Sequence, residues 1–258
     1  MKAEIRDIIA YLYSFAPELG DCCDRCTWDG GNKAAGKIAV TCFPSVNSLR
    51  SAADWGAELM ITHEPLFYNH SDVFSDNLVS NEKKRLLTES KMTVWRWHDH
   101  AHAAVPDAIN EGIRTVLGSG EYEERDIGLY RPARRYRLDT PLTAREILRR
   151  IGNQGNIVGC ADKPMSRLSL CCGFAQEQTI ICEIASGEVD AVIAGETLQW
   201  NAAEYVRDAY QLGYELALIL GGHSVTEEFG MKLLSERLKT KFPECEVKFF
   251  SSVAPFTL

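Results

Sequence analysis

The chain changes its hydrophobic pattern near residue 37. Before that point Ile5, Ile8, Ile9, Leu12 and Phe15 recur at helical spacing, which predicts a helix over residues 3–15 with one buried face, followed by a loop rich in Cys, Asp and Gly. From Lys37 onward, short β-rich runs alternate with helical stretches, beginning with a strand at 38–43 and a helix at 46–53. This alternation predicts an α/β fold.

Seven further strands follow from apolar, β-branched runs. They are expected at 58–62, 92–97, 136–138, 167–172, 189–194, 215–220 and 246–251. Helices fill most of the gaps; Thr143 and Glu146 have capping-box spacing for a helix at 144–151, and Pro106 is placed at a helix start.

Two stretches follow one plan, which predicts an internal duplication. Residues 56–64 can be laid on residues 188–196, which pairs Glu64 with Glu196. Downstream, one strand leads into His-x-x-x-His (98–102) and another into His-x-x-x-Glu (223–227). We therefore expect two similar α/β lobes, the first formed by residues 1–130 with roughly 225–258 and the second by 131–224.

Composition and charge exclude several classes of protein. With 45% apolar and 25% charged residues the chain is ordinary for a globular protein, and the net charge of −8 disfavours nucleic acid and anionic membranes as partners. No apolar run approaches the roughly 18 residues of a membrane span, and the polar N-terminus lacks the pattern of a signal peptide. A cytoplasmic location is expected. The basic run of Arg131, Arg134, Arg135 and Arg137 is interpreted as a solvated linker rather than a phosphate site.

The nine cysteines are an odd number and lie mostly in apolar runs, so disulfides are not indicated. Cys23 and Cys26 have C-x-x-C spacing and Cys22 adjoins them, but no second ligand pair for zinc and no thioredoxin-like context is visible. Thiols on a loop are the favoured interpretation, and their role stays open.

Five of the six histidines lie at or just after the end of an expected strand: His63, His98, His100, His102 and His223. Ligands of open α/β sheets bind beyond the carboxyl ends of the strands, so several of these side chains are expected to converge. Residues four apart share one face of a helix, which pairs His223 with Glu227 and His98 with His102. Imidazole together with carboxylate suits zinc, iron, manganese or nickel, and not calcium.

Several motifs resemble the Nif-three-like dinuclear-metal family. They are an early Trp-Asp pair (28–29), the stretch Ile-Thr-His-Glu-Pro-Leu-Phe (61–67), Trp-His (97–98), Ala-Gly-Glu (194–196) and Gly-His-x-x-Thr-Glu-x-x-Gly (222–230). The resemblance covers nearly the whole chain. It implies two intertwined three-layer α/β/α domains, a homohexamer, and two divalent metal ions per subunit held by His63, Glu64, His98, His102, His223 and Glu227.

Two of these positions depart from the family pattern. Glu64 stands where the family has a second histidine, and His102 stands where many members have an aspartate, so the numbers of imidazoles and carboxylates are unchanged. Asp99 or His100 is an alternative ligand if the loop is threaded differently.

Two metal ions that lower the pKa of a bound water and polarise a small, nucleotide-like substrate predict a metal-dependent hydrolase, with Glu196 as a candidate general base. The family resemblance points to type 2 GTP cyclohydrolase I. Alternatively, Glu196 only holds a helix start or a loop. A non-catalytic metal-binding or regulatory scaffold is the other function compatible with these residues. A metallo-β-lactamase-like hydrolase is disfavoured because its His-x-His-x-Asp-His order is missing.

Overall fold

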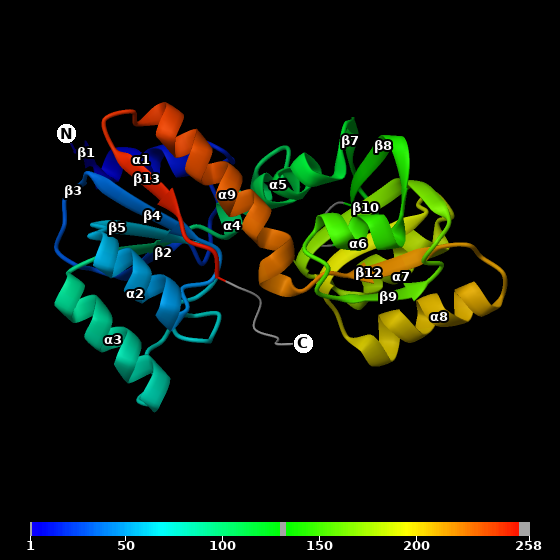
Figure 1. Ribbon diagram of the computed structural model, residues 1–258, viewed down its shortest axis with the longest axis horizontal. Coiled ribbons are helices and arrows are strands. Elements are labelled where there is room, and N and C mark those ends of the chain that lie inside the picture. The colour runs from blue at the N-terminus through cyan, green and yellow to red at the C-terminus, as the bar shows by residue number, and fades with distance from the viewer. Residues whose placement is uncertain (1, 130–132, 253–258) are drawn as a thin grey trace. The chain divides into compact units, whose positions relative to one another are not determined.

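The computed structural model describes residues 2–129 and 133–252 (Figure 1). These residues form two compact units: the first comprises the residues up to Ile109 and those from Gly230 onward, and the second comprises Asn110–Phe229. The division falls inside two helices, α5 (Ala108–Leu117) and α9 (His223–Lys241). Of the two boundaries predicted from sequence, the one between residues 130 and 131 lies outside the described residues, and the one between 224 and 225 falls inside α9.

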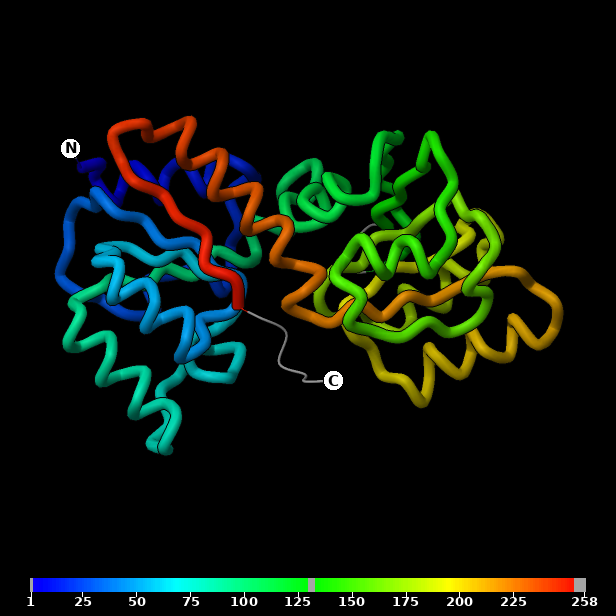
Figure 2. The backbone as a smooth tube through the Cα atoms, in the orientation of Figure 1, coloured from blue at the N-terminus to red at the C-terminus, as the bar shows by residue number. Residues whose placement is uncertain are grey.

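The first unit is built on a sheet of order β13-β4-β5-β6-β2. Its parallel strands are β4 (Lys37–Thr41), β5 (Leu59–Thr62), β6 (Thr93–Arg96) and β13 (Glu246–Phe249). An antiparallel strand, β2 (Arg25–Trp28), closes the edge beside β6. The C-terminal strand β13 thus pairs with β4, an early strand of the chain, as Figure 2 shows in red beside blue. A short pair, β1 (Ala3–Glu4) with β3 (Ala34–Ala35), lies outside this sheet.

Helices cover both faces of this sheet (Figure 1). On one face, α2 (Val46–Trp55) and α3 (Leu78–Ser90) bury Leu49, Leu86 and Leu87 against Met60 and Val94 of the strands. On the other face lie α1 (Ile5–Tyr13) and α9. The carbonyl of Leu12 in α1 accepts a hydrogen bond from the indole of Trp97, which follows β6, at 3.2 Å. The unit therefore has three layers, with the sheet between two layers of helices (α/β/α).

The second unit is built on a sheet of order β7-β8-β10-β11-β12-β9. Three parallel strands form its centre, β10 (Pro164–Phe174), β11 (Ala191–Glu196) and β12 (Ala217–Leu220). Antiparallel strands flank them: β8 (Ala133–Thr143), β7 (Gly120–Arg125) and β9 (Asn156–Gly159).

Helices on this second sheet bury its central strands. On one face α7 (Glu177–Ala185), the π-helix η1 (Gln199–Ala203) and α8 (Glu204–Gln211) pack through Ile180, Ile184 and Val206 against β11 and β12. The helix α6 (Ala144–Arg150) also contacts β9 and β12. Its predicted capping box is confirmed, because Thr143 Oγ1 accepts from the amide of Glu146 and the Glu146 carboxylate accepts from the amide of Thr143.

The α/β class predicted from the alternation of strands and helices is confirmed. The arrangement is compatible with an internal duplication: β5 leads into Glu64 and its parallel neighbour β6 leads into His98, while β11 ends at Glu196 and its parallel neighbour β12 leads toward His223.

Several local predictions were wrong. The Cys-rich segment read as a loop contains β2, and the basic run read as a linker lies in β8 where it is described; Arg131 lies outside the described residues. Arg135 forms ion pairs with the buried Glu183 of α7 and with Glu188, so this arginine helps to hold α7 on the sheet. Pro106 precedes α5 by two residues.

Among residues 2–129 and 133–252, no helix is both long enough and apolar enough to cross a membrane.

Candidate metal centre

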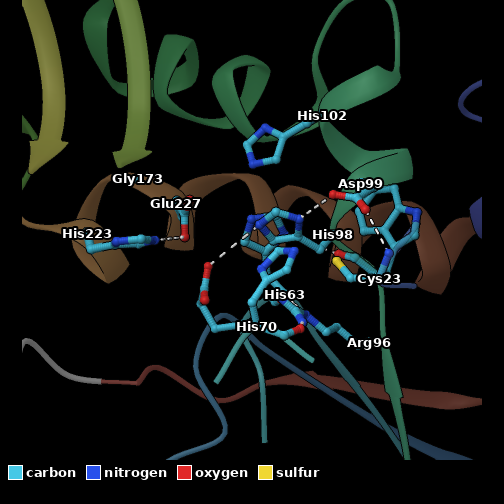
Figure 3. Close-up of polar contacts among 12 residues, drawn as sticks. Cys23, His63, His70, Arg96, His98, Asp99, His102, Gly173, His223 and Glu227 are labelled. Atoms are coloured by element: carbon cyan, nitrogen blue, oxygen red, sulfur yellow. Dashed lines mark hydrogen bonds and ion pairs between the residues drawn. The ribbon is translucent and has the colours of Figure 1, made fainter. Parts of the chain in front are cut away.

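Three histidines of the first unit meet beyond the ends of β5 and β6. His63 follows β5, His98 is the N-cap residue of the short helix α4 (Asp99–Ala103), and His102 lies one turn further along α4. The ring centroids are 4.5 Å apart for His63 and His98, 5.0 Å for His63 and His102, and 5.1 Å for His98 and His102 (Figure 3). One nitrogen from each ring lies within 4.8 Å of the others, so these side chains can hold one metal ion. We call them the imidazole cluster.

Each ring of the imidazole cluster has its Nδ1 atom fixed by a hydrogen-bond acceptor. The acceptors are the Trp97 carbonyl for His63 (3.1 Å), Asp99 Oδ1 for His98 (2.8 Å) and Asp107 Oδ2 for His102 (3.0 Å). An acceptor at Nδ1 selects the tautomer with its proton on that atom and places the ring's coordinating lone pair on Nε2. These hydrogen bonds therefore orient all three rings for coordination through Nε2.

Burial keeps His98 neutral. Desolvation lowers the pKa of His98 to about 4, assisted by the neighbouring His63, while the hydrogen bond that His98 donates to Asp99 acts in the opposite direction. Donation from His98 in turn holds the pKa of Asp99 far below its usual range. A neutral imidazole at physiological pH is the form that binds metal.

Glu64 brings a carboxylate to the same place. Its Oε1 lies 3.9 Å from His98 Nε2, the coordinating nitrogen. Two ligands at about 2.1 Å from a shared tetrahedral ion are about 3.4 Å apart, so a small side-chain movement lets Glu64 and His98 share one ion.

The loop that carries His63 and Glu64 is held by two buried cations. The guanidinium of Arg96 donates to the carbonyls of His63 (3.2 Å) and His70 (2.7 Å), and Lys83 Nζ donates to the carbonyl of Leu66 (2.8 Å). Both cations are almost fully buried, and Lys83 Nζ also lies 4.0 Å from the ring centroid of Tyr68. The ligand loop is therefore rigidly attached to β6 and α3.

A second group of ligands lies in the second unit, at the start of α9. His223 Nε2 is 3.4 Å from Glu227 Oε2 (Figure 3), a separation that suits two ligands of one ion. His223 Nδ1 is 2.8 Å from Glu196 Oε1. Glu227 is only 2% exposed, whereas the side chain of Glu196 is 58% exposed. A buried carboxylate is costly without a positive or metal partner. We call His223, Glu227 and Glu196 the helix-start cluster.

Glycine backbones make room for the helix-start cluster. Gly173, near the end of β10, has a φ of +74° and no space for a Cβ, which would overlap the Glu227 carboxylate and lie 3.2 Å from His223 Nε2. Gly195 is equally confined, because a Cβ there would lie 2.8 Å from the Cα of His223. At both glycines, backbone atoms without a side chain therefore pack directly against the helix-start cluster.

The predicted ligands fall into the two clusters, and the two alternatives do not join the imidazole cluster. Asp99 binds Nδ1 of His98 instead, and the His100 ring is hydrogen-bonded to Asp24. Sequence reasoning missed the supporting residues Asp24, Arg96 and Asp107. Of these three, only Asp107 could have been found from the sequence, because it is a carboxylate five residues after His102 and next to a helix start.

The cysteines are all thiols in the structure, and burial raises the pKa of Cys23 to about 12. A Cys23–Cys26 pair does not form a metal site among the described residues, because no group of metal-competent side chains there contains both.

An α/β chain of this kind, with histidines and glutamates gathered beyond its strand ends, belongs to a class of candidate metalloproteins. The Duf34/NIF3 (NGG1p interacting factor 3) family model matches residues 3–255, and the chain belongs to that family. The resemblance noted from the motifs is thereby confirmed. No curated protein matches the chain.

Solved structures of similar fold share little sequence with the chain. The protein ybgI, described as of unknown function, is 22% identical with a TM-score of 0.75, and the match covers 97% of each chain. Reduced HcgD from Methanocaldococcus jannaschii is 18% identical with a TM-score of 0.72 over 99% of each chain. A Bacillus cereus protein related to NIF3 is 14% identical with a TM-score of 0.71, over 100% of this chain and 99% of the other. At these identities the comparisons show the fold alone.

Proposed function

We propose that the protein binds two divalent transition-metal ions per chain. The ligands are His63, Glu64, His98 and His102 from the first unit and His223 and Glu227 from the second. The observation that carries the proposal is the imidazole cluster, in which all three rings have Nδ1 fixed and are arranged to coordinate through Nε2. Neutral imidazoles and carboxylates suit zinc, iron, manganese or nickel.

We further propose that the protein is a metal-dependent hydrolase that acts on a small, nucleotide-like substrate, in the manner of a type 2 GTP cyclohydrolase I. Bound divalent ions would supply Lewis acidity and a lowered pKa of water. Glu196 is the candidate general base, because its carboxylate is exposed and lies against His223.

Elemental analysis of protein purified without chelators tests the metal proposal. About two transition-metal ions per chain are expected, because each cluster offers several ligands. A content near zero would contradict the proposal.

A screen of nucleoside triphosphates and related cyclic amides with the metal-loaded protein tests hydrolysis. The Glu196→Gln variant keeps an oxygen that can accept from His223 Nδ1 but cannot take up a proton, so it should retain metal and lose turnover. Full metal content without turnover on any substrate would favour a binding or regulatory scaffold instead.

We also propose that the protein assembles as a homohexamer. Large exposed apolar side chains gather along one stretch of the second unit, on η1, α8 and the residues after it: Leu198, Trp200, Tyr205, Tyr210, Leu212 and Tyr214. Exposed apolar surface of this kind is typical of protein interfaces.

A further inference from the structure

A third group of metal-competent side chains lies where the Cys-rich segment meets α4. Cys22, Asp24 and His100 each bring one ligand atom within 4.8 Å of the others. None of them belongs to the imidazole cluster. We propose that these three side chains form a further site for a single zinc-type ion, bound through thiolate, carboxylate and imidazole.

Two of the three ligands are already fixed in place. The side chain of Asp24 is fully buried, and its Oδ2 lies 2.6 Å from Nδ1 of the nearly buried His100. The His100 ring stacks on Tyr13, with the centroids 4.2 Å apart and the planes 13° from parallel. Cys22 is partly accessible, so the thiol is the open side of the group. An oriented carboxylate and imidazole beside an accessible thiol form a site to which an ion can gain entry.

Asp24 also has a structural role, which accounts for part of this arrangement. Its carboxylate accepts from the amides of His98, Asp99 and His100 and so caps α4. The cap uses no atom of the Cys22 thiol, so capping explains the position of Asp24 but not the convergence of all three groups. An ion between His100 Nδ1 and Asp24 Oδ2 needs these atoms to separate to about 3.4 Å, which a modest side-chain rotation supplies. The two cap bonds on Oδ1, from the amides of His98 and Asp99, can persist meanwhile, and the amide of His100 can share Oδ2 with the ion.

The ligand set distinguishes this site from the two clusters described above. It contains sulfur, whereas the imidazole and helix-start clusters contain only nitrogen and oxygen ligands. A thiolate, a carboxylate and an imidazole suit zinc, whose tetrahedral coordination would leave a fourth position for water. Thiolate bound to Co²⁺, the usual spectroscopic substitute for zinc, absorbs strongly in the near ultraviolet.

Cobalt titration of the reduced, chelator-treated full chain tests the proposal. In the wild type the near-ultraviolet thiolate band should saturate at about one thiolate-bound cobalt per chain, in addition to the ions held by the other two clusters. Cys22→Ser should lose the band and that ion. Cys26→Ser is the matched control, since Cys26 lies in β2 outside every such group among the described residues, and it should keep both.

Two outcomes overturn the proposal: no thiolate band in the wild type, or a band that persists in Cys22→Ser. If the persisting band is lost in Cys23→Ser, the thiolate is that of Cys23, beside His98 and Asp99. His63→Ala should reduce binding at the imidazole cluster without removing the band, so this proposal and the proposed function can fail separately. His100→Gln, which lacks the imidazole, should lower the thiolate band at equal cobalt concentration by at least tenfold. Circular dichroism of each variant verifies that the fold is retained.

Discussion

Gly173 and Glu227 are in direct apposition: there is no room for even a methyl group between the backbone of β10 and the Glu227 carboxylate. The two elements are also joined by the amide of Gly173, which donates to Thr226 Oγ1 at 3.0 Å. We therefore expect Gly173→Ala to displace Glu227 and to weaken metal binding about ten- to a hundredfold, the range found when groups that orient ligands are altered.

Equilibrium dialysis with zinc would measure this change. Gly187→Ala is the matched control, because Gly187 also has a positive φ of +69° but has nothing within 4 Å of an added Cβ. It imposes similar backbone strain without touching a ligand. Equal affinities for the two variants would show that Glu227 does not depend on the space at Gly173.

Glu227→Gln and His223→Ala should each lose metal while keeping the fold. Gln preserves the shape of the side chain but removes the anionic charge, and Ala removes the imidazole that lies 3.4 Å from Glu227. The apolar strands beneath contribute most of the stability and are untouched. Metal content per chain and the circular dichroism spectrum are the two readouts. The control is Glu228→Gln, the same chemical change one residue further along α9; a loss of metal there as well would point to net charge rather than to coordination.

Asp107→Asn tests the support of His102. Asp107 Oδ2 lies 3.0 Å from His102 Nδ1, while its Oδ1 accepts from the amide of Ile109 at the start of α5. Asn can keep the helix contact but cannot accept from His102 with a charged oxygen, so zinc affinity should fall about tenfold or more. The free energy of unfolding, measured with urea, should change by only about 1 kcal/mol. Unchanged affinity would mean that the tautomer of His102 is set by other neighbours.

The convergence of the histidines could be predicted from the sequence better than the residues that support them, for a physical reason. Histidines after strand ends are placed by the parallel sheet itself, so His63 and His98 could be expected together from the strand pattern alone. Asp24 reaches α4 from a segment more than 70 residues away, and Arg96 reaches back to the His63 loop from inside a strand. Such contacts depend on tertiary packing that no local spacing encodes.

Two of the strands that sequence analysis missed share a different cause. β7, with the sequence Gly-Glu-Tyr-Glu-Glu-Arg, carries almost no apolar side chain and is a strand because β8 pairs with it. β2 lies within a run of cysteines and charged residues, and it is likewise an edge strand, paired with β6. At an edge the neighbouring strand supplies the hydrogen bonds, so hydrophobic periodicity gives a weak signal.

The proposed hexamer predicts a particle of six times 28.8 kDa in light scattering at micromolar concentration. Trp200→Glu should shift the protein toward smaller species, because Trp200 is 74% exposed on η1 within the apolar stretch. Val73→Glu, a comparable change at an exposed apolar residue of the first unit, is the control. A monodisperse monomer in the wild type would contradict the proposal.

Lys83 should make the stability of the metal-free protein depend on pH. Burial lowers the pKa of Lys83 to about 8 in the folded chain, opposed by the nearby Asp72, whereas the ordinary value of 10.5 applies to the unfolded chain. Between these values the unfolded state binds the proton more tightly than the folded state, so the free energy of unfolding rises with pH from about 8 to about 10.5. Below pH 8 the full penalty of burying the charge is present.

Lys83→Met removes this titration while roughly preserving side-chain volume. Urea unfolding near pH 7 and near pH 10 should show that the wild type gains up to about 3 kcal/mol relative to the variant at the higher pH. Titrating tyrosines are common to both proteins and cancel in the comparison. Lys84→Met, at an exposed position on the same helix, should follow the wild type at both pH values. Because Lys83 holds the carbonyl of Leu66 in the ligand loop, Lys83→Met should also weaken zinc binding near pH 7, where the ammonium donates that bond. If the variant tracks the wild type at both pH values, Lys83 does not carry the pH dependence, and its ammonium is charged in the folded protein throughout this range.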